Sequence, residues 1–250
     1  MHANRMPPST PRRRFLAALL LLAAALAPAS AALAYTKNRV ATDAAGNPVR
    51  IQGSVVLVEP DIELSEVLAG GVQEPRQAWT EAARRLYPQA VHRQLAVANT
   101  AVKPDYIVPR DLAPESRLGQ ILRLNEAVSV SILAYTTPGN TLATKRGKRL
   151  DWTLGPGVQE LRAVTGADYA LFTYIRDSYT SGGQAALRIA ALLLLGSDIG
   201  GGRQIGVTTL VDLRTGQVVW FNFLAKQTGD LRDEPGAAAT AERMLKGLPL

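Results

Sequence analysis

Hydrophobic residues recur with two different spacings along this chain, and each spacing predicts a different kind of element. The β-branched run SVVLVEPDIEL at 54–64 is typical of a strand buried on both faces. Apolar residues three and four apart predict helices over 74–96 and 116–135, and Pro88 should kink or divide the first of them. Further strands are expected at 105–109, 167–177, 204–213 and 217–225, and further helices at 155–166 and 236–246.

The segment VDLRTGQVVWFN at 211–222 predicts a tight hairpin. Asp212 can accept backbone hydrogen bonds in the turn, and Gly216 can adopt the positive φ that such a turn requires. Side chains alternate along a strand, so Trp220 and Phe221 should face opposite sides of the sheet. One should pack on the core, and the other should lie under a helix or at a partner surface.

These elements together predict an α/β fold with a single mixed sheet, a C-terminal antiparallel hairpin and helices packed against the sheet. The pattern extends over 54–250, which we interpret as one domain. Residues 35–53 are polar and aperiodic, so we expect a flexible N-terminal arm there.

The first 34 residues have the composition of a secretory signal peptide. Three consecutive arginines, Arg12 to Arg14, precede an apolar run of 13 residues from Phe15 to Ala27. Small residues follow, and Ala32-Leu33-Ala34 fits the cleavage rule, so we expect cleavage before Tyr35. The run is short for a helix that spans a bilayer, which needs about 20 apolar residues. We therefore predict a periplasmic or secreted protein.

Charge and cysteine content reduce the range of possible functions and attachments. The leader carries four arginines and no acid, so the rest of the chain has 24 basic and 21 acidic residues, a net charge of +3. That balance is too weak to predict nucleic-acid binding. The chain has no cysteine, which excludes disulfides and a cysteine-linked lipid anchor.

Few residues could carry catalysis or hold a metal. His92 is the single histidine after the leader, and we interpret it as solvent-facing, so ordinary zinc sites are not expected. The glycine-rich segment 196–204 precedes a strand and lacks the Gly-Lys-Ser/Thr of a phosphate loop. We predict no catalytic, cofactor-binding or metal-binding residue.

Paired carboxylates remain the one chemical alternative. Asp168 with Asp177, or Asp230 with Asp233, could support cell-wall glycan hydrolysis if two acids faced one cleft about 5–10 Å apart. Acids at strand ends and turns, Asp212 among them, more often cap the backbone. A small-ligand binding module is a third hypothesis, which requires an apolar pocket with convergent polar groups.

An apolar insertion at about 181–206 is flanked by glycines on both sides. Its core, AALRIAALLLLG at 185–196, is too short to span a bilayer as a helix. It predicts either a buried helix or a mobile element that docks on a protein partner, on a second copy or on the membrane surface. The hypothetical partner-binding residues are Leu187, Ile189, Leu192, Leu193, Leu194, Trp220 and Phe221.

Two motifs resemble those of a known group of bacterial envelope proteins. Gly166-Ala167-Asp168-Tyr169 is followed by Asp212, Thr215, Gly216 and Trp220 in a D-x-x-T-G-x-x-x-W hairpin. This pattern is similar to the CsgG-like and TolB-amino-terminal-domain-like proteins. The resemblance implies a non-enzymatic scaffold or accessory protein of envelope assembly or secretion that binds protein partners.

Overall fold

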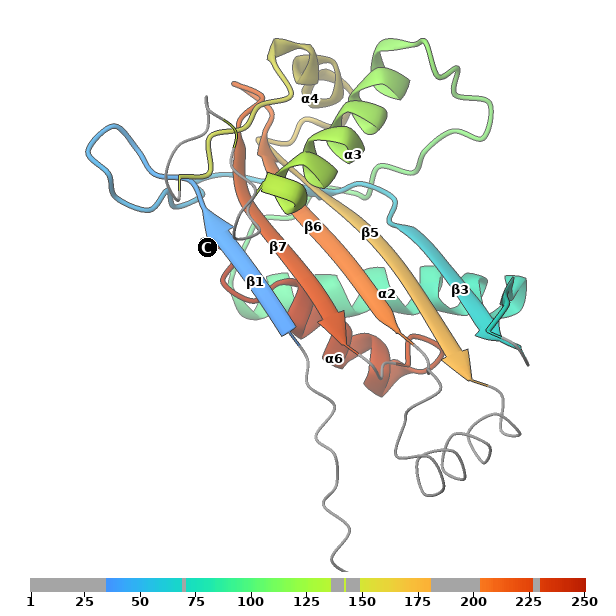
Figure 1. Cartoon of the computed structure of the whole chain (residues 1–250). Coiled ribbons are helices and arrows are strands. Elements are labelled where there is room, and N and C mark those ends of the chain that lie inside the picture. The colour runs from blue at the N-terminus through green and yellow to red at the C-terminus, as the bar shows by residue number, and fades with distance from the viewer. Residues whose placement is uncertain (1–34, 69–70, 136–141, 143–148, 181–202, 227–229) are drawn as a thin grey trace, which may run out of the picture. The chain divides into compact units, whose positions relative to one another are not determined.

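A twisted mixed sheet forms the centre of the protein (Figure 1). The computed structural model describes residues 35–68, 71–135, 142, 149–180, 203–226 and 230–250, which belong to one compact unit. Strand β5 (Tyr169–Thr180) pairs in parallel with β3 (Asp61–Val67) and the short β2 (Val55–Leu57), and all other strand pairs are antiparallel. The prediction of an α/β fold with a single mixed sheet is confirmed. In spatial order the strands are β1 (Tyr35–Val40), β7 (Val218–Lys226), β6 (Gln204–Asp212), β5 (Tyr169–Thr180), β3 (Asp61–Val67) and β4 (Gln73–Pro75), with β2 (Val55–Leu57) beside β5.

Helices cover both faces of the sheet. The long helix α2 (Gln77–Val97) and the C-terminal helix α6 (Glu234–Met244) pack on one face, where they bury a core that contains Leu171 and Leu210. On the other face lie α3 (Arg117–Tyr135) and α4 (Gln159–Thr165), which the 3-10 turn η1 (Pro156–Val158) precedes. With helices on both sides of the sheet (Figure 1), the two faces have separate hydrophobic cores.

Trp220 and Phe221 face opposite sides of the sheet, as their spacing predicts. Trp220 belongs to the core beneath α2 and α6, and Phe221 to the core beneath α3 and α4. Both side chains have 0 % exposure. The expectation that they bind a partner is corrected, because the sheet is covered on both faces at this point.

The N-terminal segment differs from the expected flexible arm. Residues 35–40 form the edge strand β1, which pairs with β7 along its whole length. The segment is polar because an edge strand borders solvent, so its composition concealed a paired strand. Residues 105–109 likewise form no strand, since only Tyr106 makes an isolated bridge to Val58.

Two helix expectations are also revised. Helix α2 is not divided at Pro88, which lies within its 21 residues. Tyr87 and Val91, on either side of this proline, are both fully buried, so packing on the sheet holds the helix together across the lost hydrogen bond. The start of α2 also differs from the expected residue 74, because residues 73–75 form the edge strand β4 and the helix begins at Gln77.

The hairpin between β6 and β7 has the predicted turn chemistry. The Asp212 carboxylate accepts from the Arg214 backbone N–H at 2.8 Å, and the Gly216 N–H donates to the Asp212 carbonyl at 2.7 Å. Gly216 has φ +80°, and a Cβ there would lie 2.1 Å from the Gly155 carbonyl oxygen. Glycine is therefore required by both the backbone conformation and the close approach.

Candidate functional site

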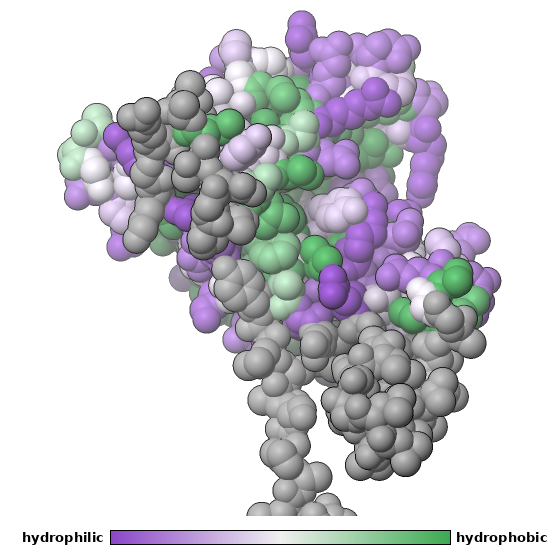
Figure 2. Space-filling model, viewed as in Figure 1, coloured by the Kyte–Doolittle hydropathy of each residue, from purple (hydrophilic) through white to green (hydrophobic). Residues whose placement is uncertain are grey.

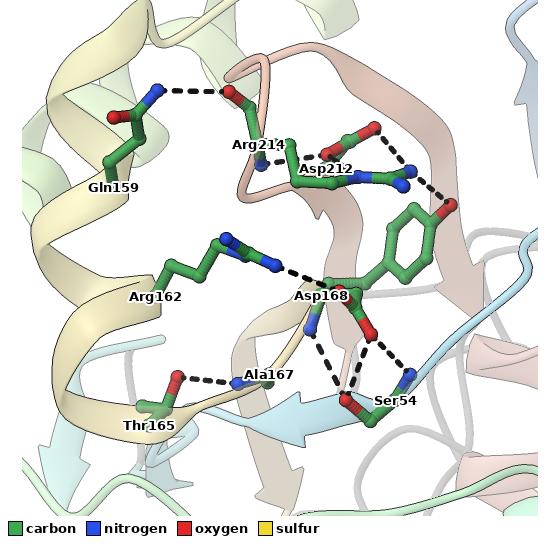
Figure 3. Close-up of polar contacts among 9 residues, drawn as sticks. Ser54, Gln159, Arg162, Thr165, Ala167, Asp168, Asp212 and Arg214 are labelled. Atoms are coloured by element: carbon green, nitrogen blue, oxygen red, sulfur yellow. Dashed lines mark hydrogen bonds and ion pairs between the residues drawn. The ribbon is translucent and has the colours of Figure 1, made fainter.

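Asp168 ties three parts of the chain together at the hairpin end of the sheet (Figure 3). Its carboxylate accepts from the Ser54 N–H at 3.0 Å and the Ser54 hydroxyl at 3.2 Å, and from Arg162 Nη2 at 3.3 Å. The Ser54 backbone bond, with Arg162 adding to it, lowers the pKa of Asp168. This acid is thus held ionised by the groups that it positions.

Arg214 makes a second set of contacts beside Asp168 (Figure 3). Its guanidinium donates to the Asp212 carboxylate and, at 3.1 Å, to the Tyr169 hydroxyl. The Arg214 carbonyl accepts from Gln159 of α4 at 3.2 Å. Residues of the two sequence motifs, among them Asp168, Tyr169 and Asp212, therefore help to hold α4, the hairpin and the start of β5 together, which is a structural role.

Of the carboxylates considered for glycan hydrolysis, Asp168 and Asp177 are not brought together, and Asp230 and Asp233 are engaged by other groups. Asp168 immediately precedes β5 and Asp177 lies nine residues further along, which is roughly 30 Å of extended strand. Asp230 pairs with Arg232 at 2.7 Å, and Asp233 caps α6 by accepting from the Gly236 N–H. Asp230 and Asp233 thus have turn and capping roles, and Asp168 connects Ser54 with Arg162.

Asp177 belongs to a buried polar cluster that the sequence analysis missed. Its side chain accepts from the Tyr179 hydroxyl at 2.7 Å and from Gln204 Nε2 at 2.5 Å. Thr240 of α6 donates to Gln204, and Lys226 of β7 lies 3.4 Å from Thr240. Burial raises the pKa of Asp177 to about 6, even though both hydrogen bonds and Lys226 lower it. The sequence signal that could have indicated this cluster is the presence of an acidic residue within the apolar run of β5.

The other chemical candidates have ordinary contacts. His92 is not purely solvent-facing, because its Nε2 lies 2.8 Å from an Asp105 carboxylate oxygen. Among the described residues, no three histidine, cysteine or acidic side chains are grouped as a metal site would require. Within the same residues, no helix has the length and apolarity needed to cross a membrane.

Helices α3 and α4 cover only one end of their sheet face, and no described helix lies over the remaining part of that face (Figure 1). Alternate residues of β6 and β7 are fully buried under α6 and α2, whereas those on this face are partly exposed. We call these partly exposed side chains, with their neighbour on β5, the open face: Tyr174, Ile205, Val207, Phe223 and Ala225. Figure 2 shows hydrophobic surface running from α3 over β6 and β7, with hydrophilic surface toward β5 and β3.

A groove of about 390 Å³ continues the open face beneath α3. Leu122, Phe172 and Val207 contribute to its apolar wall. Asn125 and Thr209 also line it, and the Thr209 hydroxyl donates to the Asn125 side-chain oxygen at 2.8 Å. The Asn125 NH₂ group has no hydrogen-bond partner among the described residues, so it can donate to an occupant of the groove.

The residues expected to bind a partner fall into two groups. The leucines and isoleucine expected to bind partners, at 187–194, lie outside the described residues. Trp220 and Phe221 are buried. The residues of the open face were missed because their spacing matches that of any strand, and only the positions of the helices show which half of a face remains uncovered.

The protein was compared with known families and structures. No family model matches the chain, and no curated protein matches its sequence. Two solved structures of the PelC dodecamer from Paraburkholderia phytofirmans, one of them a single-substitution variant, are similar at a TM-score of 0.38 and 12 % identity. The match covers 85 % of this chain and 95 % and 96 % of those chains. This similarity is too distant to carry an argument about function, and the resemblance to CsgG-like and TolB-like proteins stays a prediction.

Proposed function

We propose that this chain is an exported, non-enzymatic scaffold or accessory protein of the bacterial cell envelope that binds a protein partner on its open face. The observation that carries the proposal is the apolar, partly exposed half of one sheet face, whereas the opposite face of β5, β6 and β7 is buried under α2 and α6. The signal-peptide pattern of the leader and the motif resemblance support the proposed export to the cell envelope.

Exposed side chains of opposite charge border the open face and favour a protein partner over a lipid surface. Arg176 lies 4.0 Å over the Tyr174 ring and pairs with Asp61 at 3.0 Å, which places both charges beside the apolar strands. An apolar centre with a polar, charged border is the usual arrangement of a protein interface.

Site-specific photo-crosslinking tests this proposal. With a photoreactive residue in place of Val207, we expect one discrete protein adduct in intact cells, because Val207 lies on both the open face and the groove. The same residue in place of Arg85, exposed on the outer side of α2, is the matched control and should give none. Equal adducts at both positions, or no adduct at Val207, would refute the open face as the partner site.

The predicted removal of the leader has its own test. N-terminal sequencing of the protein purified from cells should give Tyr35 as the first residue.

The groove favours a second candidate function, a small-ligand binding module. Its volume is within the range of ligand sites, and Asn125 supplies a polar donor beside the apolar side chains of Leu122, Phe172 and Val207. We expect native mass spectrometry to detect a bound small molecule that is lost in Leu122→Trp, which fills the groove. Leu124→Trp is the control, since Leu124 is 42 % exposed on α3 and does not line the groove. Retention of the adduct in Leu122→Trp excludes the groove as its site.

A further inference from the structure

The outer edge of β1 offers unpaired backbone groups to a partner. The Ala41 N–H donates to the Val219 carbonyl at 2.8 Å, and Val40 lies opposite Trp220, so the odd-numbered residues of β1 direct their backbone toward β7. The N–H and C=O groups of Thr36, Asn38 and Val40 then point away from the sheet. Among the described residues, none of these outward groups has a hydrogen-bond partner.

On the opposite side of the sheet, several outer backbone groups of β3 are bonded to residues at the start of α2 or paired with the short edge strand β4, which distinguishes β3 from β1. On β3, the Leu64 N–H donates to the Thr80 hydroxyl at 2.9 Å, and the Leu64 carbonyl accepts from the Arg76 N–H at 2.8 Å. Arg84 donates to the Ile62 carbonyl at 3.2 Å. Strand β4 covers the remainder of β3. Helix α2 thus satisfies groups that an added strand would need, and no described residue satisfies the outward backbone groups of β1 in the same way.

The charge of β1 determines what could pair with it. Lys37 and Arg39 point to the same face as the open face, and both are partly exposed. Burial together with the neighbouring Arg39 charge lowers the pKa of Lys37, as expected for two cations side by side. Lys246, whose carbonyl accepts from the Asn38 side chain, adds a further basic residue at this edge.

These charges argue against pairing with a second copy. Antiparallel pairing of two β1 strands about Asn38 would set Lys37 opposite Arg39 of the other copy, twice. Like charges directly opposite on neighbouring strands are destabilising. A strand with acidic residues at alternate positions would instead place a carboxylate beside each cation.

We propose that the β1 edge binds an extended segment of a partner protein, with acidic residues at alternate positions, which adds to the sheet as a further strand beside Thr36, Asn38 and Val40. This inference names the partner chemistry for the scaffold function proposed above and rests on it. Backbone hydrogen bonds provide affinity in such an addition, and the side chains beside Lys37 and Arg39 provide specificity.

The test uses an acetylated, labelled hexapeptide of alternating glutamate and valine and the protein expressed from its full sequence. Asn38→Pro removes an outward N–H that β7 does not use, and proline is tolerated on an edge strand. Asn38→Ala is the matched control, because both variants lose the side-chain bond to the Lys246 carbonyl. We expect Asn38→Pro to bind the peptide at least about tenfold more weakly than Asn38→Ala, measured by fluorescence anisotropy.

A charge-reversed variant gives an independent readout if the proline variant does not fold. Lys37→Glu with Arg39→Glu should lose the glutamate peptide and gain a peptide of alternating lysine and valine. Equal binding by Asn38→Pro and Asn38→Ala, or equal binding of acidic and basic peptides by the natural sequence, would overturn the inference. Should the Val207 cross-link persist in that case, the scaffold function stands and only the strand addition fails.

Discussion

Replacing Trp220 with alanine is expected to lower the free energy of unfolding by about 3–5 kcal/mol, the usual cost of removing a large aromatic side chain from a core. Trp220 has 0 % exposure in the core beneath α2 and α6, so the cavity would lie where neither helix can move in without losing its own contacts. Denaturant unfolding followed by circular dichroism measures the change.

Two companion variants show whether packing is the cause. Trp220→Phe should cost markedly less, because it keeps most of the ring and removes an indole N–H that is buried without a hydrogen-bond partner. Val97→Ala, at a position 83 % exposed, should change stability by less than about 0.5 kcal/mol. If Trp220→Ala weakened partner capture and left stability unchanged, the assignment of Trp220 to the core would be wrong.

The second large effect is a pH dependence that Asp177 introduces. Burial raises its pKa from a usual value of 3.8 to about 6, so the folded protein holds this proton over a pH range in which the unfolded chain has released it. Stability contributed at this site is therefore full below pH 4 and is lost as the pH rises to 6. The loss is about 3 kcal/mol by pH 7, at about 1.4 kcal/mol for each unit of pKa difference.

Asp177→Asn removes the titrating group and keeps its shape and much of its hydrogen bonding. We expect unfolding of this variant to be less dependent on pH between 4 and 6 than unfolding of the natural sequence. Asp111→Asn, an exposed carboxylate replaced by the same amide, is the control and should follow the natural sequence. Parallel pH profiles for Asp177→Asn and the natural sequence would show that Asp177 is not the origin of the dependence. Lys226 is the neighbouring titratable group in this cluster, and burial lowers its pKa.

The hairpin was predictable because its requirements are local. Asp212 and Gly216 act within a few residues of one another, and the alternation of a strand places Trp220 and Phe221 on opposite faces. Gly166 is a similar case, with φ +64° at the end of α4. In each case a backbone conformation and a residue type determine the result without help from distant contacts.

The candidate site was not predictable, because it depends on contacts between residues far apart in the chain. β1 reads as a polar arm until its pairing with β7, about 185 residues later, is known. Asp177 reads as a strand-end acid until Gln204 and Thr240 are found around it. For the hydrolase alternative, Asp168 and Asp177 could be placed relative to each other only once the extended strand β5 between Asp168 and Asp177 was known.

The amino-acid sequence by itself determined that this is an α/β protein with a C-terminal hairpin, because hydrophobic periodicity and turn chemistry are local properties of the chain. It also indicated a leader with the pattern of a signal peptide. Only the tertiary structure decided which sheet edge is open, which half of a face lies uncovered, and that Trp220 and Phe221 are core residues. Burial and strand pairing depend on which distant segments meet, and no local pattern contains that information.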